Sequence, residues 1–307
     1  MNNKSEKTSP LVALVVPVHN NKEDTIEFLE SLKNVTYPNY KIVIVDDGST
    51  DGTDDIIQEK YPYVLLLKSD GTLWWTRSFN YGVKKAIEIN ADYVLQVDND
   101  IVVDPGFISA LVNTAKNNPR SIVASKTYYY YDPKRISEAG CDMNWVKGGF
   151  RVIGRGEIDN GRYETQRDLK CTVHGFLTNV EIFKDIGMLD EKLPHVKSDW
   201  DFTYRAYRKG YRIIYEPRSK IWHKVSSTAK KKIALDKSFI KSPISTLDCS
   251  ISSKSRGGPL SLRELVYVYR KHFSIKFLYI VLYHIVRRII RELKVLLVSP
   301  FAQNSSK

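Results

Sequence analysis

Apolar segments and helical segments alternate along residues 11–126, and this order constrains the fold more than any other feature. The apolar segments are rich in β-branched residues, as buried strands are. Between them, apolar residues recur at helical spacing; Ile26, Leu29 and Leu32 share one face in this way. The alternation predicts an α/β fold with a parallel sheet covered by helices on both faces. The predicted strands are LVALVVPV (11–18), KIVIV (41–45), VLLL (64–67), YVLQV (93–97) and SIVAS (121–125).

The alternation ends after residue 126. Residues 127–162 are rich in aromatic residues, glycine and arginine, and we expect irregular strands and loops over the open edge of the sheet. Helical spacing returns at EIFKDIG (181–187) and DWDFTYRAYRKG (199–210), and a long helical segment is predicted over residues 261–298. The Ser- and Lys-rich residues 226–258 between these helical regions indicate a linker or mobile loop.

Composition limits the class of protein. The chain has 307 residues, of which 42% are hydrophobic, enough for a sizeable core. Its three cysteines, Cys141, Cys171 and Cys249, lie far apart without disulfide or zinc spacing, as is typical of a reducing compartment. The first ten residues, MNNKSEKTSP, lack the apolar region of a secretory signal. We therefore expect a cytoplasmic protein.

The net charge of +12 is concentrated at one end of the chain. Residues 218–307 contain 19 Lys and Arg against 4 Asp and Glu, whereas the remainder contains 28 against 31. Basic segments of this kind bind nucleic acid or anionic membranes. From Val286 to Leu297, aliphatic residues and arginines segregate at helical spacing, which favours a helix lying in a membrane surface over a nucleic-acid partner. The alternative is a helix that docks on the rest of the protein.

Acidic clusters follow two of the predicted strands, at the sheet edge where α/β proteins bind ligands. The strand at 41–45 leads into VDDGSTDGT (45–53), and the strand at 93–97 leads into Asp98-Asn99-Asp100. Either cluster could be a simple polar turn. However, two carboxylates at the mouth of a buried strand repel each other unless a cation lies between them. Carboxylate oxygens suit a hard divalent ion such as Mg²⁺ or Mn²⁺.

Three ordered segments together resemble the family 2 glycosyltransferases, which are inverting enzymes that use nucleotide sugars. They are VVPVHNNKEDTIEFLESLKNVTYPNYKIVIVDDGSTDGT, GTLWWTRSFNYGVKKA and YVLQVDNDIVVDPGFISAL. The likeness covers about residues 10–225 and implies a GT-A fold with a Rossmann-like, mostly parallel sheet flanked by helices. The charge and helical spacing of the tail add a helical basic C-terminal extension. GTLWWTRSFNYG is also similar to the rhamnosyltransferase subgroup of cell-surface polysaccharide assembly.

The resemblance implies roles for individual residues on the donor side. Asp47 would contact the base, Asp98 would lie near the ribose, and Arg77 would bind phosphate. Asp100 would bind the metal, Mn²⁺ or Mg²⁺, with Asp98, and His223 of IWHKVSS would join them. The full donor-binding set implied by the resemblance is Pro17, His19, Asn20, Asp47, Gly71, Trp74, Trp75, Arg77, Asn80, Asp98 and Asn99.

HVKSDWDFTYRAYRKGY (195–211) resembles the family's EDxDLxxR segment, in which the middle acidic residue is the general base. Asp199 takes that position, where it would remove the proton from the acceptor hydroxyl. Asp201 and Arg205 would hold the start of the helix. The chain departs from the pattern at Ser198, where the family often has Glu, and Asp199 could instead be a helix cap. The implied acceptor-side residues are His174, Gly175, Trp200 and Asp201.

The resemblance, together with the composition and helical spacing of residues 226–307, divides the chain into a catalytic domain (1–225), a linker or mobile loop (226–260) and a basic amphipathic helical region (261–307). Within the domain, residues 10–126 would bind the nucleotide sugar and 127–225 the acceptor, a glycan or lipid-linked glycan. We expect the enzyme at the inner face of the cell membrane. A sugar nucleotidyltransferase would need a Gly-rich phosphate loop where this chain has PVHNNKED. A degenerate, non-catalytic binding protein remains the alternative.

Overall fold

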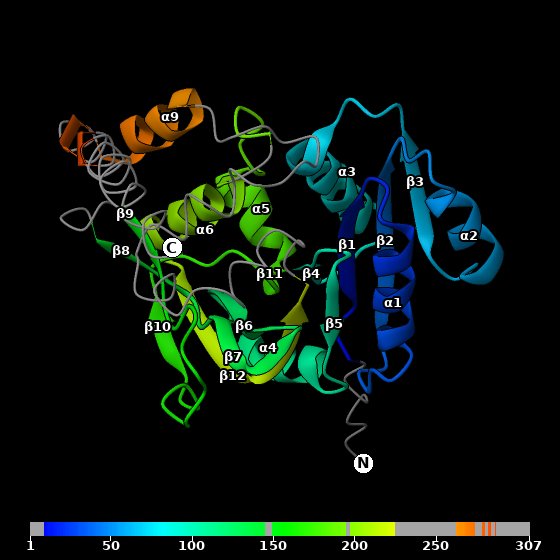
Figure 1. The fold of residues 1–307 in the computed structure, drawn as a ribbon, viewed down its shortest axis with the longest axis horizontal. Coiled ribbons are helices and arrows are strands. Elements are labelled where there is room, and N and C mark those ends of the chain that lie inside the picture. The colour runs from blue at the N-terminus through cyan, green and yellow to red at the C-terminus, as the bar shows by residue number, and fades with distance from the viewer. Residues whose placement is uncertain are drawn as a thin grey trace, which may run out of the picture.

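The computed structural model describes residues 9–144, 149–194, 197–224 and 262–273, together with Leu278, Tyr279, Leu282, Tyr283 and Val286. The described strands form a ten-stranded sheet and a separate two-stranded ribbon (Figure 1). The main path of the large sheet has the order β10-β12-β6-β11-β4-β1-β2-β3, and β5 and β7 pair at its side. This confirms the predicted α/β fold with a mostly parallel sheet.

The first half of the chain builds the parallel part of the sheet. Its strands are β1 (Val12–Val18), β2 (Tyr40–Asp47), β3 (Leu65–Ser69) and β4 (Tyr93–Gln96), and all of them pair in parallel. The residues of β1 are all buried, because alternate side chains enter two different cores. Val12, Leu14 and Val16 belong to one core, and Ala13 and Val15 to the other.

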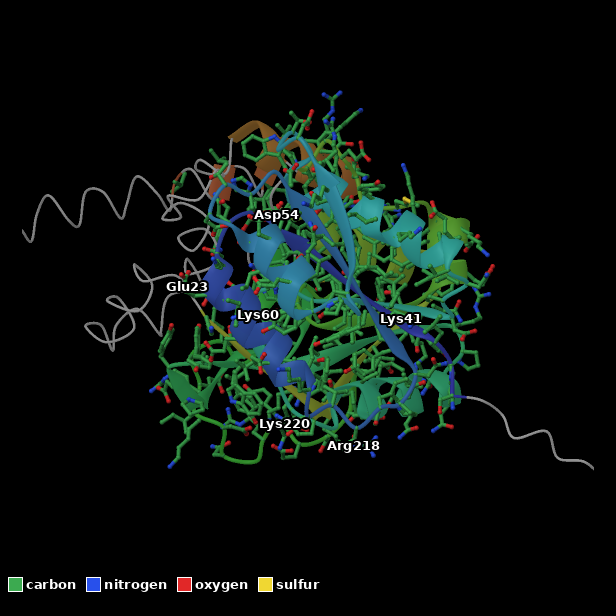
Figure 2. The ribbon with its side chains drawn as sticks, turned by 90° about the vertical axis from the view of Figure 1, so that its right-hand side faces the viewer. Glu23, Lys41, Asp54, Lys60, Arg218 and Lys220 are labelled. Atoms are coloured by element: carbon green, nitrogen blue, oxygen red, sulfur yellow. The ribbon has the colours of Figure 1, made fainter. Side chains whose placement is uncertain are left out.

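Helices cover both faces of this parallel part. The first core contains Phe28 of α1 (Lys22–Leu32) and Phe107 of α4 (Phe107–Asn117), and the second contains Phe79 of α3 (Trp74–Glu88). Helix α2 (Thr53–Lys60) lies beside α1 and β3. Figure 2 looks onto the α1 and α2 side and shows charged residues such as Glu23 and Lys60 on its outer surface.

The second half extends the sheet in a way that the sequence pattern does not predict. β11 (Phe176–Asn179) lies antiparallel between β4 and β6 (Ser121–Tyr129), so the strand predicted at 121–125 does not adjoin β4. The region expected to be irregular carries β7 (Asp132–Glu138) and a ribbon of β8 (Cys141–Asn144) and β9 (Gly149–Val152). The strand β12 (Arg212–His223) pairs with β6, with β5 (Ile101–Val103) and with β10 (Arg167–Leu169).

The remaining helices are α5 (Val180–Ile186), α6 (Ser198–Arg208) and α9 (Leu262–Phe273). Helix α9 lies beside α6 (Figure 1), and its Val268 and Tyr269 are buried in the same apolar cluster as Trp200. The linker predicted at 226–260 lies outside the described residues, as does the helix predicted at 286–297 apart from Val286. Among the described helices, none has the length and apolar character needed to cross a bilayer.

Candidate active site

Asp98 follows β4, and three side chains from different elements converge on it. Trp75 of α3 donates its indole N–H to Asp98 Oδ1 at 2.9 Å, and His174 Nδ1 lies 3.1 Å from Oδ2. Gln96 Nε2 reaches Oδ1 at 3.4 Å, while its Oε1 accepts the N–H of Gly175 at 3.1 Å. Gln96 therefore ties the donor-side strand to the predicted acceptor segment around His174.

Asp98 and His174 form a charged pair. Burial acts to raise the pKa of Asp98, but the hydrogen bond and charge of His174, the charge of His223 and the bond from Trp75 outweigh it, so this pKa lies below its ordinary value. Burial acts to lower the pKa of His174, yet the hydrogen bond and charge of Asp98, together with other nearby carboxylates, raise it to about 9. The pairing with Asp98 therefore favours the protonated form of His174.

Asp100 and His223 are brought together by strand pairing across more than a hundred residues of sequence. β5 starts directly after Asp100 and pairs with the end of β12, where Ile101 opposes His223. As a result, His223 Nε2 lies 3.2 Å from Asp100 Oδ2, and the rings of His174 and His223 are 4.8 Å apart. The other carboxylate oxygen, Asp100 Oδ1, is buried and has no hydrogen-bond partner within the described part of the chain.

This donor set fits a hard divalent cation. A buried carboxylate oxygen without a hydrogen-bond donor is costly unless a cation or another donor approaches it. Across the described residues, no group of three His, Cys, Asp or Glu side chains is arranged as a complete metal site. The protein would therefore supply few ligands, chiefly Asp100, and the diphosphate of a ligand would supply others. Asp98 accepts three hydrogen bonds already, so its part in holding a metal stays a prediction.

Asp199 lies at the start of α6, half-buried, and its Oδ1 accepts the backbone N–H of Trp200 at 2.8 Å. Burial is the main cause that raises the pKa of Asp199 to about 7. The charge of His174 and the Trp200 N–H act against this shift, while the charges of Glu138 and Asp98 act with it. A carboxylate with a pKa near 7 is suited to accept a proton at neutral pH.

Three loops at the strand ends contact one another beside this cluster. His19 Nδ1 lies 2.7 Å from the Asp47 carbonyl oxygen, and Asn20 Oδ1 accepts the N–H of Thr50 at 2.9 Å. Gly48 has a φ of 67°, and a Cβ there would lie 2.8 Å from the backbone nitrogen of Gly71. The loops after β1, β2 and β3 thus form one connected unit, with Pro17 at the end of β1.

The Asp47 side chain fixes the start of α3. Its carboxylate accepts hydrogen bonds from Ser69 Oγ at 2.7 Å, Leu73 N at 3.1 Å and Trp74 N at 2.8 Å. The residue is 3% exposed. Contact of Asp47 with a base stays a prediction, and in the free protein this carboxylate holds the segment that carries Trp75.

Several other predicted residues connect elements of the scaffold. Asn80 exchanges hydrogen bonds with the backbone of Leu189, at 3.0 and 3.1 Å, and Asn99 donates to Thr25 of α1 at 2.8 Å. Arg77 lies 3.3 Å from Glu191, and both side chains are about half exposed. Asn80, Asn99 and Arg77 therefore contact residues of the surrounding scaffold. The residues that the structure brings together are Trp75, Asp98, Asp100, His174 and His223.

Trp200 and Asp201 lie in the packing between α6 and α9. The Trp200 ring lies 4.6 Å from that of Phe150, and Asp201 is fully buried. Sequence reasoning missed Glu138, whose Oε1 accepts from Thr172 Oγ1 and Val173 N, both at 3.2 Å, directly before His174. It also missed Gln96, although a polar residue inside the otherwise apolar strand YVLQV could have indicated a role in the site.

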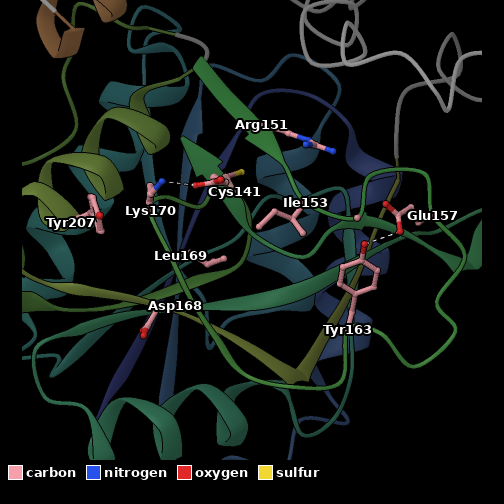
Figure 3. A pocket seen from close by; sticks show the side chains of 11 residues that line it. Cys141, Arg151, Ile153, Glu157, Tyr163, Asp168, Leu169, Lys170 and Tyr207 are labelled. Carbon is pink, nitrogen blue, oxygen red and sulfur yellow. Dashed lines mark hydrogen bonds and ion pairs between the residues drawn. The ribbon is translucent and has the colours of Figure 1, made fainter. Parts of the chain in front are cut away.

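A separate cavity of about 540 Å³ lies in the second half of the chain (Figure 3). Its walls come from β8, β9, β10, the loop at 153–163 and Tyr207 of α6, and they include the ion pair of Lys170 and Asp142 at 3.0 Å. None of Asp98, Asp100, His174 or Asp199 lines it. The residues predicted to carry the chemistry therefore gather outside this cavity.

Solved structures share this fold. The crystal structure of GalNAc-T7 with UDP, GalNAc and Mn²⁺ matches with a TM-score of 0.59 and 14% identity, covering 72% of this chain and 46% of that one. The mannosyltransferase PcManGT from Pyrobaculum calidifontis, in complex with GDP-Man and Mn²⁺, gives a TM-score of 0.52 and 18% identity over 72% and 59% of the two chains. The fold is therefore that of the GT-A glycosyltransferases.

Sequence relatives point the same way. The poly-β-1,6-N-acetyl-D-glucosamine synthase of Staphylococcus epidermidis is 24% identical over 226 residues, 71% of this chain and 50% of the relative. Glycosyltransferase GlyG of Streptococcus pneumoniae serotype 4 is 30% identical over 129 residues, 40% of this chain and 41% of the relative. The chain thus spans half or less of the length of these relatives. The profile described as "Glycosyl transferase family 2" matches residues 13–187, which is more than half of the chain, so the protein belongs to this family.

Proposed function

We propose that the protein is an inverting glycosyltransferase of cell-surface polysaccharide synthesis. It takes a sugar from a UDP- or dTDP-linked donor, with dTDP-rhamnose favoured by the likeness of GTLWWTRSFNYG, and adds it to a hydroxyl of a glycan or lipid-linked glycan. The observation that carries the proposal is Asp199, a carboxyl group with a pKa of about 7 at a helix start, whose nearby charges include His174 and Asp98. Family membership supplies the reaction class.

In the proposed reaction, the Asp199 carboxylate accepts the proton of the acceptor hydroxyl. The hydroxyl oxygen then attacks the anomeric carbon from the face opposite the diphosphate, and the bond between that carbon and the phosphate oxygen breaks. This attack inverts the anomeric centre. The His174 cation and Trp75 keep Asp98 ionised and oriented at the donor side. A divalent cation, Mn²⁺ or Mg²⁺, held by Asp100 with Asp98 and His223, would stabilise the charge on the leaving diphosphate.

The Asp199→Asn variant tests the proposal. Wild-type protein incubated with a panel of nucleotide sugars, an acceptor glycan and Mn²⁺ should release free nucleoside diphosphate. The variant should lose this release by about 10²-fold or more, because general base catalysis contributes on that order. Its melting temperature should still rise with donor and Mn²⁺, because the donor residues are unchanged. Full activity of the variant would refute the assignment of the base.

We further propose that the C-terminal region binds an anionic membrane surface at the inner face of the cell membrane. Two observations support this: the excess of 19 Lys and Arg over 4 Asp and Glu after residue 217, and a row of exposed apolar side chains in the described part of that region. Leu278, Leu282 and Val286 recur every four residues and are 61%, 59% and 45% exposed. Sedimentation with lipid vesicles tests this proposal.

A further inference from the structure

Helix α9 is packed against the helix that carries Asp199. Its Val268 is fully buried and its Tyr269 is 2% exposed, both within the apolar cluster that contains Trp200. The Lys197 ammonium, at the N-terminal boundary of α6, lies 4.8 Å from the Trp200 ring and 5.5 Å from that of Tyr269. This packing fixes the orientation of α9 on α6.

Two basic residues of α9 reach the first turn of α6. Lys271 Nζ and His272 Nε2 both lie 2.7 Å from Asp201 Oδ1, and Arg205 Nε donates to the other oxygen, Oδ2, at 2.8 Å. Asp201 is fully buried, so its charge depends on these partners. Burial acts to raise the pKa of Asp201, but the contacts from His272, Lys271 and Arg205 lower it to about 2. Asp201 follows Asp199 by two residues, within the same turn.

Lys271 also holds the loop that precedes α6. Its Nζ lies 2.6 Å from Asp190 Oδ2, which accepts a hydrogen bond from Tyr267 at 2.7 Å as well. The same loop is tied to the donor half, because Thr76 of α3 donates to the Leu193 carbonyl oxygen at 2.5 Å. Thr76 also lies 2.8 Å from Ser198, the residue immediately before Asp199.

We propose that Lys271 and His272 are positioning residues for the general base. By fixing Asp201 and Asp190, they hold the first turn of α6, and with it Asp199, against α3 and the donor side. This inference rests on the proposed function of Asp199. A helix from the C-terminal region, beyond residue 225, therefore completes the catalytic domain. General bases act within a narrow range of geometry, and small displacements of the reacting groups cost rate rather than affinity.

The test compares Lys271→Met and His272→Gln with Arg270→Met, a change at the exposed residue that precedes Lys271 on α9. Each of the first two should lower kcat for nucleoside diphosphate release by about tenfold, with a smaller change in the KM for the donor, because the residues that fix Asp201 are Arg205, Lys271 and His272, none of them a predicted donor residue. Lys271→Arg should recover most of the rate, since it keeps the charge. Arg270→Met should behave as the wild type.

Hydrogen exchange provides a readout that does not depend on catalysis. Amides of residues 199–203 should exchange faster in Lys271→Met and His272→Gln, at a melting temperature that shows both variants folded, and no faster in Arg270→Met. Unchanged exchange there, or an unchanged kcat, would overturn the inference. If the wild type transfers no sugar, the proposed function fails, and the exchange result still decides whether α9 orders the first turn of α6.

Discussion

At the scale of single residues, the protonation of Asp199 sets the pH dependence of the proposed reaction. Burial raises the pKa of this carboxyl to about 7, so the base form is present above that pH and is lost below it. We expect kcat/KM to be level above about pH 7 and to fall about tenfold per pH unit below it. Initial rates at saturating Mn²⁺ between pH 5 and 8.5 measure this. If kcat/KM instead began to fall only near pH 4, the result would contradict the buried environment of Asp199.

The charge of Glu138 is a second determinant of that pH dependence. Glu138 is 1% exposed, and its negative charge acts with burial to raise the pKa of Asp199. Glu138→Gln removes the charge but keeps an oxygen that can accept from Thr172 and Val173. In this variant kcat/KM should therefore fall at a lower pH than in the wild type. That pH should still lie above the pKa of an ordinary carboxyl group, because Asp199 remains buried. Glu181→Gln, a change at an exposed residue of α5, is the control. If kcat/KM falls at the same pH in both variants, the charge of Glu138 does not affect the pKa of Asp199.

The ends of two predicted strands were enough to single out Asp47, Asp98 and Asp100 as candidates. The resemblance, not the residue pattern, added Asp199, His174 and His223. Sequence could not show that Asn80 and Asn99 bond to scaffold partners, since Leu189 and Thr25 are distant along the chain. Glu138 could not be found either, because nothing in the segment RISEAG (135–140) shows that its side chain accepts a hydrogen bond from Val173, the residue before His174.

At the scale of elements, the loops after β2 and β3 approach each other so closely that position 48 requires glycine. Gly48 has a φ of 67°, and its missing Cβ leaves room for the backbone of Gly71. Gly210 has a φ of 92°, but a Cβ there would meet nothing within 4 Å. Gly48→Ala adds a backbone clash to the strain of a positive φ, whereas Gly210→Ala adds the strain alone.

We therefore expect Gly48→Ala to reduce the free energy of unfolding by about 2 kcal/mol or more, and Gly210→Ala by about 1 kcal/mol. Urea unfolding followed by circular dichroism measures both. The stabilising effect of UDP and Mn²⁺ on the melting temperature should also fall in Gly48→Ala, because its loop adjoins Asp47 and Ser49. Equal losses of stability in the two variants would mean that the Gly71 backbone can move aside.

The parallel part of the sheet was predictable because each strand there is a continuous apolar run. The second half was not, since β11 carries Thr178 and Asn179 within four residues and β8 and β9 lie outside the main sheet. The antiparallel insertion of β11 between β4 and β6 depends on pairings between residues 80 to 86 positions apart with β4 and 52 to 56 apart with β6, which no local pattern encodes. That insertion is what places His174, two residues before β11, beside Asp98.

At the scale of the whole molecule, charge is separated along the chain, and this makes a prediction about lipid surfaces. The region from residue 218 onward has 19 Lys and Arg against 4 Asp and Glu, while the rest has 28 against 31. Lys271 and His272 are paired with acidic residues of the catalytic domain, so the attraction to anionic lipid must come from other basic residues. The exposed Leu278, Leu282 and Val286 would add apolar contact with the lipid.

The protein should therefore sediment with vesicles that contain anionic phospholipid and stay in solution with purely zwitterionic ones. Raising NaCl from 0.1 M to 1 M shortens the screening length from about 10 Å to about 3 Å and should release most of the bound protein. The double change Leu278→Gln and Leu282→Gln should weaken binding at 0.1 M NaCl. Tyr63→Gln, which removes a side chain of 52% exposure from the segment between α2 and β3, should not. Equal binding to both kinds of vesicle would show that charge does not drive the attachment, and no binding to either would favour helix docking as the function of the basic region.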